Sequence, residues 1–191
     1  MNDLIKNIKA VRPHKIGLML RHADRDKIPH GSFGNEVLLN QKGLERSIRF
    51  GEELKSIPVT RIYTSPVPRC VQTSEYIVKG YGSKIDIIET NALGDPGLHI
   101  ENAEIAGEYF LKYGFHDILD NYIKGKIIPG MPAHDVFKKR INDFIETNLS
   151  EEGLTLFITH DSLVAMFEFI NNGIHYTEEN WVKYLNGPII K

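Results

Sequence analysis

Two residue pairs that can do chemistry, Arg21-His22 and His160-Asp161, each come directly after a run of apolar residues. Arg69 follows a third, shorter run. Arginine binds phosphate oxygens two at a time, and a neutral imidazole has a lone pair that can attack phosphorus. Cations that lie close together raise one another's energy unless an anion lies among them. These residue types therefore predict a phosphoryl-binding site in which a histidine is the nucleophile.

The elements that must position these residues alternate along the chain between strand and helix patterns. Strands are expected at residues 16–20, 61–64, 85–88 and 154–159. Helices are expected at residues 43–55, 69–79, 101–113, about 136–145 and 162–170, whereas residues 181–191 match neither pattern. Such alternation is typical of α/β proteins. We predict a three-layer α/β/α sandwich with a mainly parallel central sheet.

The carboxyl ends of parallel strands meet at one edge of a sheet, and ligands bind there. Because each of the chemical residues follows a strand, we expect His22, Arg69 and His160 to converge at that edge. Arg25 would add a further cation. Ser65 precedes the helix that carries Arg69, and the first N–H groups of a helix can hold an anion. We expect Arg25 and Ser65 to contact the substrate.

Two irregular segments are expected to cover this edge. Residues 23–40 are rich in Asp, Gly, Pro and Asn, and residues 95–135 contain the breaker Pro129-Gly130. Segments of this length in a compact domain are often functional. We expect one domain over residues 1–191, with 23–40 and 95–135 as a small lid that selects the substrate.

The composition excludes several classes of protein. The chain has 191 residues, of which 41% are hydrophobic and 25% charged, and its formal net charge is -2. These values are ordinary for a soluble globular protein and lack the basic excess of a general nucleic-acid binder. No apolar run approaches the roughly 20 residues of a membrane span. With a single cysteine, Cys70, we expect a cytoplasmic protein that binds neither nucleic acid nor membranes; its oligomeric state is not indicated.

Other phosphate chemistries fit the sequence less well. A cysteine phosphatase needs an arginine at a fixed distance after its cysteine, and at that distance from Cys70 the chain has Tyr76. The segment 24–28 is similar to the aspartate motif of haloacid dehalogenase-like enzymes, but it begins beyond the strand and has no clear later acidic pair for magnesium. No Cys/His spacing indicates a zinc site.

The other histidines have no comparable context. A single histidine after a strand is more often a hydrogen-bonded polar residue than a nucleophile, so the argument rests on the convergence of several groups. The remaining histidines are expected at the surface: His14, His30, His99, His116, His134 and His175.

Four segments, taken in their order along the chain, resemble the motifs of the histidine phosphatase superfamily, also called phosphoglycerate mutase-like. They are Leu20-Arg21-His22-Ala23-Asp24-Arg25, Leu39-Asn40-Gln41-Lys42-Gly43, the run from Ser65 through Arg69 to Ser74, and Ile158-Thr159-His160-Asp161. Ala23 and Ser74 stand where the family usually has Gly and Ala. Both replacements are small, and neither removes a catalytic group.

The resemblance implies a mechanism for this chain. His22 would become phosphorylated, and Arg21, Arg69 and His160 would bind the phosphoryl group during its transfer. The resemblance implies neither a metal nor another cofactor. The expected activity is hydrolysis of a small-molecule phosphomonoester through a phosphohistidine intermediate.

The general acid has candidates in two regions. In the acid-phosphatase branch of the family the Asp of the His-Asp motif donates the proton, and Arg25 also fits the Arg-His-Gly-x-Arg pattern of that branch. The small mutase-like branch uses an acidic residue upstream, and the candidates in that region are Asp95 and Glu101. From the motifs we favour Asp161 over Asp95.

Two other functions remain open. In a mutase the phosphohistidine passes its phosphate to a second hydroxyl instead of to water. A non-catalytic phosphoryl-binding module would keep the pocket without turnover. The presence of His22, His160 and an adjacent acid argues against the binding module, because binding alone would need only the arginines.

Overall fold

The computed structural model describes residues 2–10, 15–29 and 31–191. The strands are β1 (Ile16–Arg21), β2 (Val59–Thr64), β3 (Asp86–Glu89), β4 (Leu154–Thr159) and β5 (Ile189–Ile190). The helices are α1 (Asn2–Ala10), α2 (Gln41–Glu53), α3 (Pro68–Tyr81), the 3-10 helix η1 (Asn91–Leu93), α4 (Ala103–Tyr113), α5 (Phe115–Ile123), α6 (His134–Asn148) and α7 (Asp161–Asn172). Every expected strand and helix is present, with its ends shifted by a few residues.

The strands form one sheet in the order β3-β2-β4-β1-β5, in which only β5 is antiparallel to its neighbour. In the central register Arg21 pairs with Thr159, and Thr64 pairs with Ile158. The three central strands therefore end side by side. This register brings the residues that follow β1, β2 and β4 to the same edge, as the sequence predicts.

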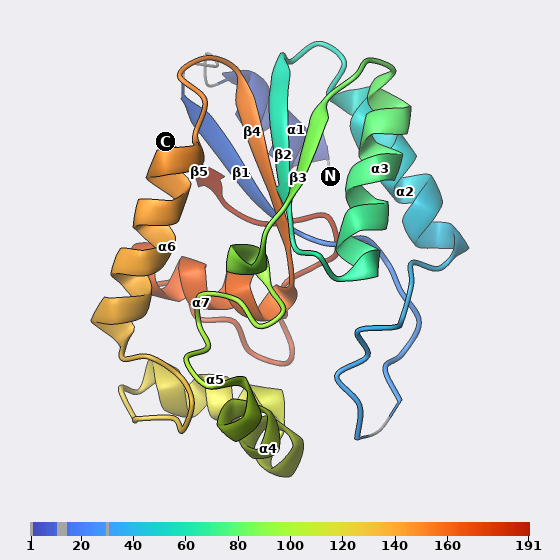
Figure 1. The fold of residues 1–191 in the computed structure, drawn as a ribbon. Coiled ribbons are helices and arrows are strands. Elements are labelled where there is room, and N and C mark those ends of the chain that lie inside the picture. Colours follow the sequence, from blue (N-terminus) through green and yellow to red (C-terminus); the bar gives the residue numbers. More distant parts are fainter. Residues whose placement is uncertain (1, 11–14, 30) are drawn as a thin grey trace.

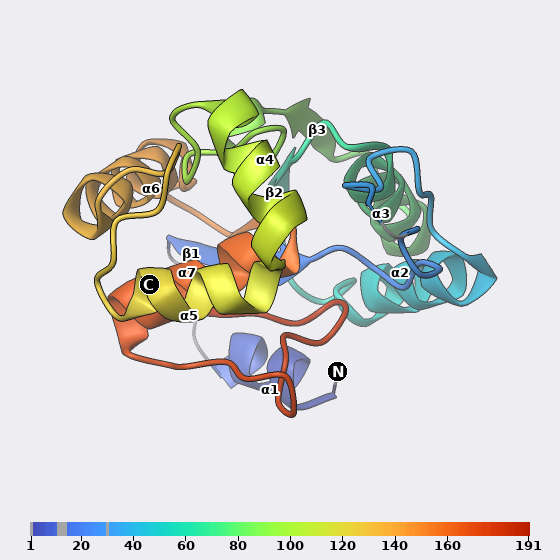
Figure 2. The ribbon, with the colours of Figure 1, turned by 90° about the horizontal axis from the view of Figure 1, so that it is seen from below.

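The alternating side chains of the strands build two apolar layers, one on each face of the sheet. Leu18 and Leu156 belong to a core shared with α1, α2 and α3. Met19 and Phe157 belong to a second core shared with α5, α6 and α7. Figures 1 and 2 show α2 and α3 on the opposite side of the sheet from α6. The expected α/β sandwich with a mainly parallel sheet is confirmed.

Helices α2 and α3 cross at a pair of glycines. An added Cβ on Gly51 would lie 2.0 Å from the carbonyl oxygen of Ile77, and one on Gly80 would lie 1.9 Å from that of Ile48. Only glycine permits two backbones to approach so closely. This contact fixes α3, and with it Arg69, against the rest of the molecule.

The two segments expected as a lid both lie beyond the carboxyl ends of the strands (Figure 1). The described residues of this first segment, 23–29 and 31–40, form an irregular loop in which an isolated bridge joins Arg25 and Leu39. The other segment contains two helices, α4 and α5, where the sequence indicated one. Phe33 of the loop reaches α4, because its Cζ atom lies 3.4 Å from the position of an added Cβ on Gly107.

Four elements were not expected: α1, η1, α5 and β5. Helix α5 buries Ile118, Leu119 and Tyr122, which form a helical apolar face inside a segment that we interpreted as irregular. Strand β5 is too short to show a strand pattern. Within the described part of the chain, no helix combines the length and apolarity that crossing a membrane requires.

The glycine contact between α2 and α3 generates a prediction for stability. We expect Gly80→Ala to lower the free energy of unfolding by about 1–3 kcal/mol, since its Cβ would overlap a backbone carbonyl that cannot move freely. Urea denaturation followed by circular dichroism measures the change. Gly107→Ala is the matched control, because its Cβ meets only the tip of the Phe33 ring. Equal losses of stability in both variants would contradict the proposed constraint.

Candidate active site

His22 lies at the end of β1 and is almost fully buried, with 1% of its surface exposed. Its Nδ1 atom lies 2.8 Å from the carbonyl oxygen of Ala23. A carbonyl only accepts, so Nδ1 carries the proton and Nε2 has the free lone pair. The Nε–H of Arg69 points at this lone pair, 3.1 Å away. His22 thus presents Nε2 to a guanidinium group.

The surroundings of His22 keep its imidazole neutral. Burial, together with the neighbouring charges of His160 and Arg69, holds the pKa of His22 well below its ordinary value. Only the hydrogen bond to Ala23, which stabilises the protonated ring, acts in the opposite direction. A neutral imidazole with an unprotonated Nε2 is the form that can act as a nucleophile.

Thr73 of α3 holds the backbone next to His22. Its hydroxyl oxygen accepts a hydrogen bond from the N–H of Ala23 at 3.0 Å and donates one to the carbonyl of Arg69 at 2.7 Å. Thr73 is fully buried, so these bonds are shielded from water. Thr73 lies in the motif that runs from Ser65 to Ser74, but its residue type alone indicates no role. Its position one helical turn after Arg69 explains its presence there.

Arg69 joins three separate segments through its guanidinium group. Besides donating to His22, it donates from Nη1 to the carbonyl of Gly34 at 2.6 Å and from Nη2 to Nδ1 of His160 at 3.2 Å. The side chain is 5% exposed. Arg69 therefore links the ends of β1 and β4 to the loop at residues 23–40.

His160 is oriented by its contacts on both ring nitrogens. Because Arg69 can only donate, Nδ1 of His160 accepts, and Nε2 carries the proton. Nε2 lies 3.1 Å from the hydroxyl oxygen of Ser65, which also accepts from the N–H of Val67. Burial and the charge of Arg69 lower the pKa of His160, so this ring is also neutral at pH 7.

Gly94, at the end of η1, packs directly on this pair. An added Cβ there would lie 2.7 Å from the Cδ2 atom of His160 and 2.7 Å from the hydroxyl oxygen of Ser65. Cys70 lies nearby, with its sulfur 3.7 Å from Nε2 of His160. Burial raises the pKa of Cys70 to about 12, so it remains a neutral thiol. A thiolate nucleophile is not favoured here.

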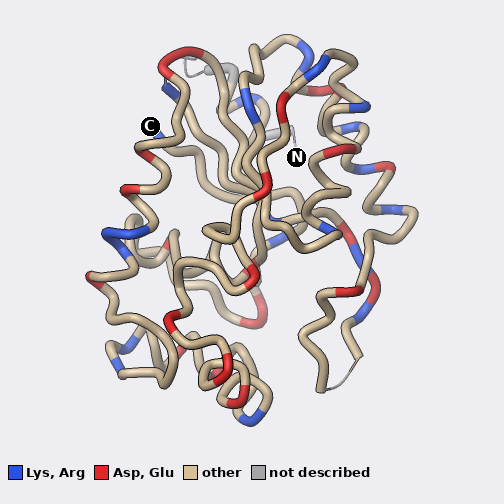
Figure 3. The backbone as a smooth tube through the Cα atoms, in the orientation of Figure 1, with Lys and Arg blue, Asp and Glu red and all other residues tan. Residues whose placement is uncertain are grey.

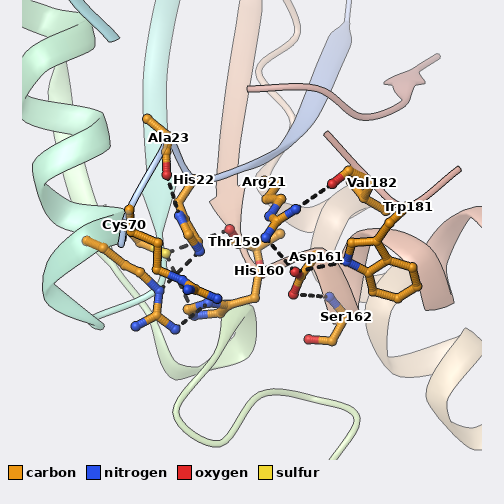
Figure 4. A network of polar contacts seen from close by, with 12 residues as sticks. Arg21, His22, Ala23, Cys70, Thr159, His160, Asp161, Ser162, Trp181 and Val182 are labelled. Atoms are coloured by element: carbon orange, nitrogen blue, oxygen red, sulfur yellow. Dashed lines mark hydrogen bonds and ion pairs between the residues drawn. The ribbon is translucent and has the colours of Figure 1, made fainter. Parts of the chain in front are cut away.

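Arg21, which is buried, and Asp161, whose side chain is 25% exposed, form an ion pair beside the histidines, with 2.8 Å between Nη2 and Oδ2 (Figure 4). Asp161 also accepts from the N–H of Ser162 and from Nε1 of Trp181, each at 3.0 Å. Burial alone would raise the pKa of Asp161, but Arg21 and these donors together hold it below its ordinary value. The contacts favour the carboxylate form, which opposes the expected role of Asp161 as a proton donor.

The arrangement suits a bound anion. The Nε–H groups of Arg21 and Arg25 are buried and have no hydrogen-bond partner among the residues that the structure describes. The charge of Arg25 also lowers the pKa of Arg69 and of His160, which reflects its proximity to both. A phosphoryl group would offset the repulsion among these cations and accept hydrogen bonds from their unpartnered N–H groups.

The other two candidates for the general acid have different surroundings. Asp95 directly follows Gly94, is exposed, and accepts a long hydrogen bond of 3.4 Å from Asn35. Glu101 pairs with Arg140 of α6 at 2.9 Å. Of the two, Asp95 lies beside residues that pack on His160.

The structure brings together most of the residues that the sequence analysis named for the site. Arg21, His22, Ser65, Arg69, His160 and Asp161 form one network of contacts, with Arg25 beside it. Among the described residues, no group of three or more His, Cys, Asp or Glu side chains is arranged to hold a metal ion.

Sequence reasoning missed several residues in and around this network. His99 was expected at the surface, but it is 9% exposed, and burial lowers its pKa to about 4. Trp181, Val182 and Tyr184 contact Arg21 or Asp161, although their segment shows no periodic pattern. Apart from the aromatic residues themselves, no signal in the sequence indicates these contacts. His14 and His30 lie outside the described residues.

Comparison with known proteins gives a consistent result. The family model described as histidine phosphatase superfamily (branch 1) matches residues 18–168. A 2,3-bisphosphoglycerate-dependent phosphoglycerate mutase of Thermoplasma acidophilum is 26% identical over 166 residues, covering 83% of this chain and 78% of that protein.

Two solved structures share the fold. The phosphoglycerate mutase of Bacillus anthracis superposes with a TM-score of 0.61 at 17% identity, covering 95% of this chain and 88% of the other. The ecdysone phosphate phosphatase of Bombix mori, solved in complex with tungstate, superposes with a TM-score of 0.56 at 14% identity, covering 92% of this chain and 88% of the other.

The contacts of Thr73 generate a second prediction. We expect Thr73→Val to lower the free energy of unfolding by about 1–3 kcal/mol, because it leaves the buried N–H of Ala23 without an acceptor. Ser74→Ala is the matched control, since Ser74 is equally buried but its hydroxyl only donates to the helix carbonyl of Cys70. Urea denaturation of the two variants should separate them; a Thr73→Val protein as stable as Ser74→Ala would refute this role.

Proposed function

Because the chain belongs to the histidine phosphatase superfamily, we propose that it hydrolyses a small phosphomonoester through a phosphohistidine formed at His22. The observation that carries this proposal is the state of His22: a buried, neutral imidazole whose unprotonated Nε2 faces the guanidinium of Arg69. Arginine stabilises the charge that spreads over a phosphoryl group in transfer. A nucleophile and its charge-stabilising group are thus 3.1 Å apart.

The first chemical step would form the phosphohistidine. Nε2 of His22 attacks phosphorus, the bond from phosphorus to the leaving oxygen breaks, and an acid protonates that oxygen as the alcohol departs. Arg21 and Arg69 neutralise the phosphoryl oxygens. The Nε2–H of His160, which lies near the hydroxyl of Ser65 in this structure, would donate to one of these oxygens in place of Ser65. The proton stays on Nδ1 of His22 throughout and remains hydrogen-bonded to the carbonyl of Ala23, so that the ring keeps its orientation.

The second step would release phosphate. A water molecule attacks the phosphorus of the phosphohistidine, its proton passes to the carboxylate that acted as the acid, and the bond between phosphorus and Nε2 breaks. The imidazole then returns to its neutral form, which the low pKa of His22 favours. Both steps use the same acid group, which alternates between its two protonation states.

We propose Asp95 as this acid, in place of Asp161. A proton donor must be able to hold a proton, whereas Asp161 is kept ionised by Arg21 and Trp181. Asp95 follows Gly94, which packs on His160 and Ser65. The side chain of Asp95 is exposed and has no ion pair among the described residues.

A phosphotransferase related to the mutases is the second candidate, favoured by the likeness to the Thermoplasma acidophilum enzyme. Such a reaction with a bisphosphorylated substrate would need cations for the second phosphate. The lysines of the segment 95–135 have other contacts: Lys112 lies over the ring of Tyr113, Lys124 pairs with Asp120, and Lys126 donates to Asn121. Figure 3 shows Asp and Glu positions along α4 and α5 as well. This charge distribution favours hydrolysis.

The proposed nucleophile generates a third prediction. We expect His22→Ala to lower kcat for 4-nitrophenyl phosphate by about a thousandfold or more, because the variant lacks the proposed nucleophile, the unprotonated Nε2 of His22. The assay is run with a chelator, and activity should be unchanged by it. His175→Ala is the control, because His175 is exposed and pairs with Asp120 away from the site.

An assay with and without a second acceptor distinguishes the two candidate reactions. Phosphate release from a monoester without any acceptor supports hydrolysis. Phosphate exchange that occurs only with a bisphosphorylated primer supports the mutase reaction. Full turnover by His22→Ala would exclude both.

The choice of acid generates a fourth prediction. We expect Asp95→Asn to lower kcat about a hundredfold or more for an alkyl phosphate, but far less for 4-nitrophenyl phosphate, whose leaving group needs no proton. Asp161→Asn should lower the rate for both substrates alike, because Arg21 loses its partner. A reversed pattern, with leaving-group dependence in Asp161→Asn alone, would restore Asp161 as the acid.

A further inference from the structure

We propose that the C-terminal strap, residues 181–188, positions the Arg21–Asp161 pair for phosphoryl binding through Trp181, Val182 and Tyr184. This inference rests on the proposed function, in which Arg21 binds the phosphoryl group. The three residues are positioning residues, because they act through Arg21 and Asp161 and have no part in the chemical steps.

The strap is bound to the backbone of β1. The N–H of Leu185 donates to the carbonyl of Arg21, and the N–H of Arg21 donates to the carbonyl of Asn186, each at 3.1 Å. Met19 donates in the same way to Pro188 at 3.1 Å. Gly187 permits this approach, since an added Cβ would lie 2.1 Å from the carbonyl oxygen of Met19. The position of the strap is therefore fixed relative to Arg21.

The strap holds the guanidinium group of Arg21 at two points. Nη1 donates to the carbonyl of Val182 at 2.5 Å, and the guanidinium carbon lies 4.0 Å from the centre of the Tyr184 ring. The ion pair with Asp161 occupies Nη2. A long, flexible side chain held in this way loses its freedom before a ligand binds. The buried Nε–H of Arg21 remains without a partner in the described part of the protein.

Tyr184 contacts the nucleophile as well. The centres of the His22 and Tyr184 rings lie 5.7 Å apart. The carbonyl of Tyr184 also accepts from Nη2 of Arg46 at 3.2 Å, and Arg46 pairs with Asp24, two residues after His22. Tyr184 thus contacts Arg21 and His22 directly and is linked to Asp24 through Arg46.

Trp181 holds the other member of the pair. Its Nε1–H donates to Oδ2 of Asp161, the same oxygen that binds Arg21 (Figure 4). The Trp181 ring also packs against lid helix α5, with ring centres 4.4 Å from His116 and 5.8 Å from Phe115. The indole therefore joins the lid to the Arg21–Asp161 pair.

A purely structural role predicts different behaviour. If the strap served only to cover the edge of β1, its substitutions would lower stability and leave anion binding by the folded protein unchanged. Tungstate is a suitable probe of anion binding, because its affinity can be measured by calorimetry without turnover. If the wild-type protein binds tungstate but hydrolyses no phosphomonoester, the proposed function is refuted. The positioning role can then still be tested by tungstate binding.

The first experiment removes the ring beneath Arg21. We expect Tyr184→Leu to weaken tungstate binding about tenfold, because Arg21 loses a shielded cation–π contact and its fixed orientation. The same variant should raise KM more than it lowers kcat. Tyr184→Phe retains the ring and should bind tungstate within about twofold of wild type. Tyr76→Leu is the matched control, because Tyr76 lies under Lys79 on the surface of α3. Wild-type affinity in folded Tyr184→Leu would overturn the proposal.

The second experiment removes one hydrogen bond and keeps the aromatic packing. Besides Trp181 and the N–H of Ser162, the charged or titratable groups around Asp161 are Arg21 and His160, and the charge of Asp161 also raises the pKa of Arg69 and of Cys70. In Trp181→Phe the carboxylate loses a donor, so its pKa rises and the ion pair with Arg21 breaks at a higher pH. As the pH is lowered, we expect the tungstate affinity of Trp181→Phe to begin to fall at a higher pH than that of the wild-type protein. At pH 8 the two affinities should agree within about twofold. Superimposable pH profiles would overturn the role of Trp181.

Discussion

The geometry of the site depends on the hydrogen bonds that the guanidinium group of Arg69 donates. This group donates to Nε2 of His22, to Nδ1 of His160 and to the carbonyl of Gly34, and so joins two strand ends and a loop. These bonds are possible only because α3 starts at Pro68 beside the end of β2. The glycine crossing of α2 and α3 holds that helix start in place. Fold and site are thus connected through one side chain.

Arg69 also determines the electrostatic state of its neighbours. A buried cation beside two imidazoles makes protonation of either ring unfavourable, and this adds to the effect of burial on both pKa values. The one described carboxylate in the network, Asp161, is paired with Arg21 and also favours the charged form of Arg69 by raising its pKa, but a single carboxylate does not offset the charges of Arg21, Arg25 and Arg69 together. The site therefore keeps a local excess of positive charge, although the whole chain has a formal net charge of -2. A phosphoryl dianion is complementary to that excess.

Much of this arrangement could be predicted from the sequence, for identifiable reasons. The apolar runs before His22 and His160 are buried parallel strands, and strand ends in such sheets converge. Contacts made by backbone carbonyls could not be predicted: Gly34 and Val182 accept from Arg69 and Arg21 through atoms that every residue has. The C-terminal strap lacks periodicity because it is bound by backbone hydrogen bonds at the sheet edge. The surroundings of Asp161 depend on Trp181, which lies 20 residues further along the chain.

The bond from Arg69 to the carbonyl of Gly34 has a consequence for how such a site can diverge. A main-chain acceptor persists whatever side chains the loop has, so substitutions at Phe33 and Asn35 leave the contact intact. Gly34 itself is constrained, because its φ is +63° and an added Cβ would lie 2.5 Å from Ile28. The loop can therefore acquire new substrate preferences through mutation around a single fixed glycine, while the catalytic groups keep their geometry.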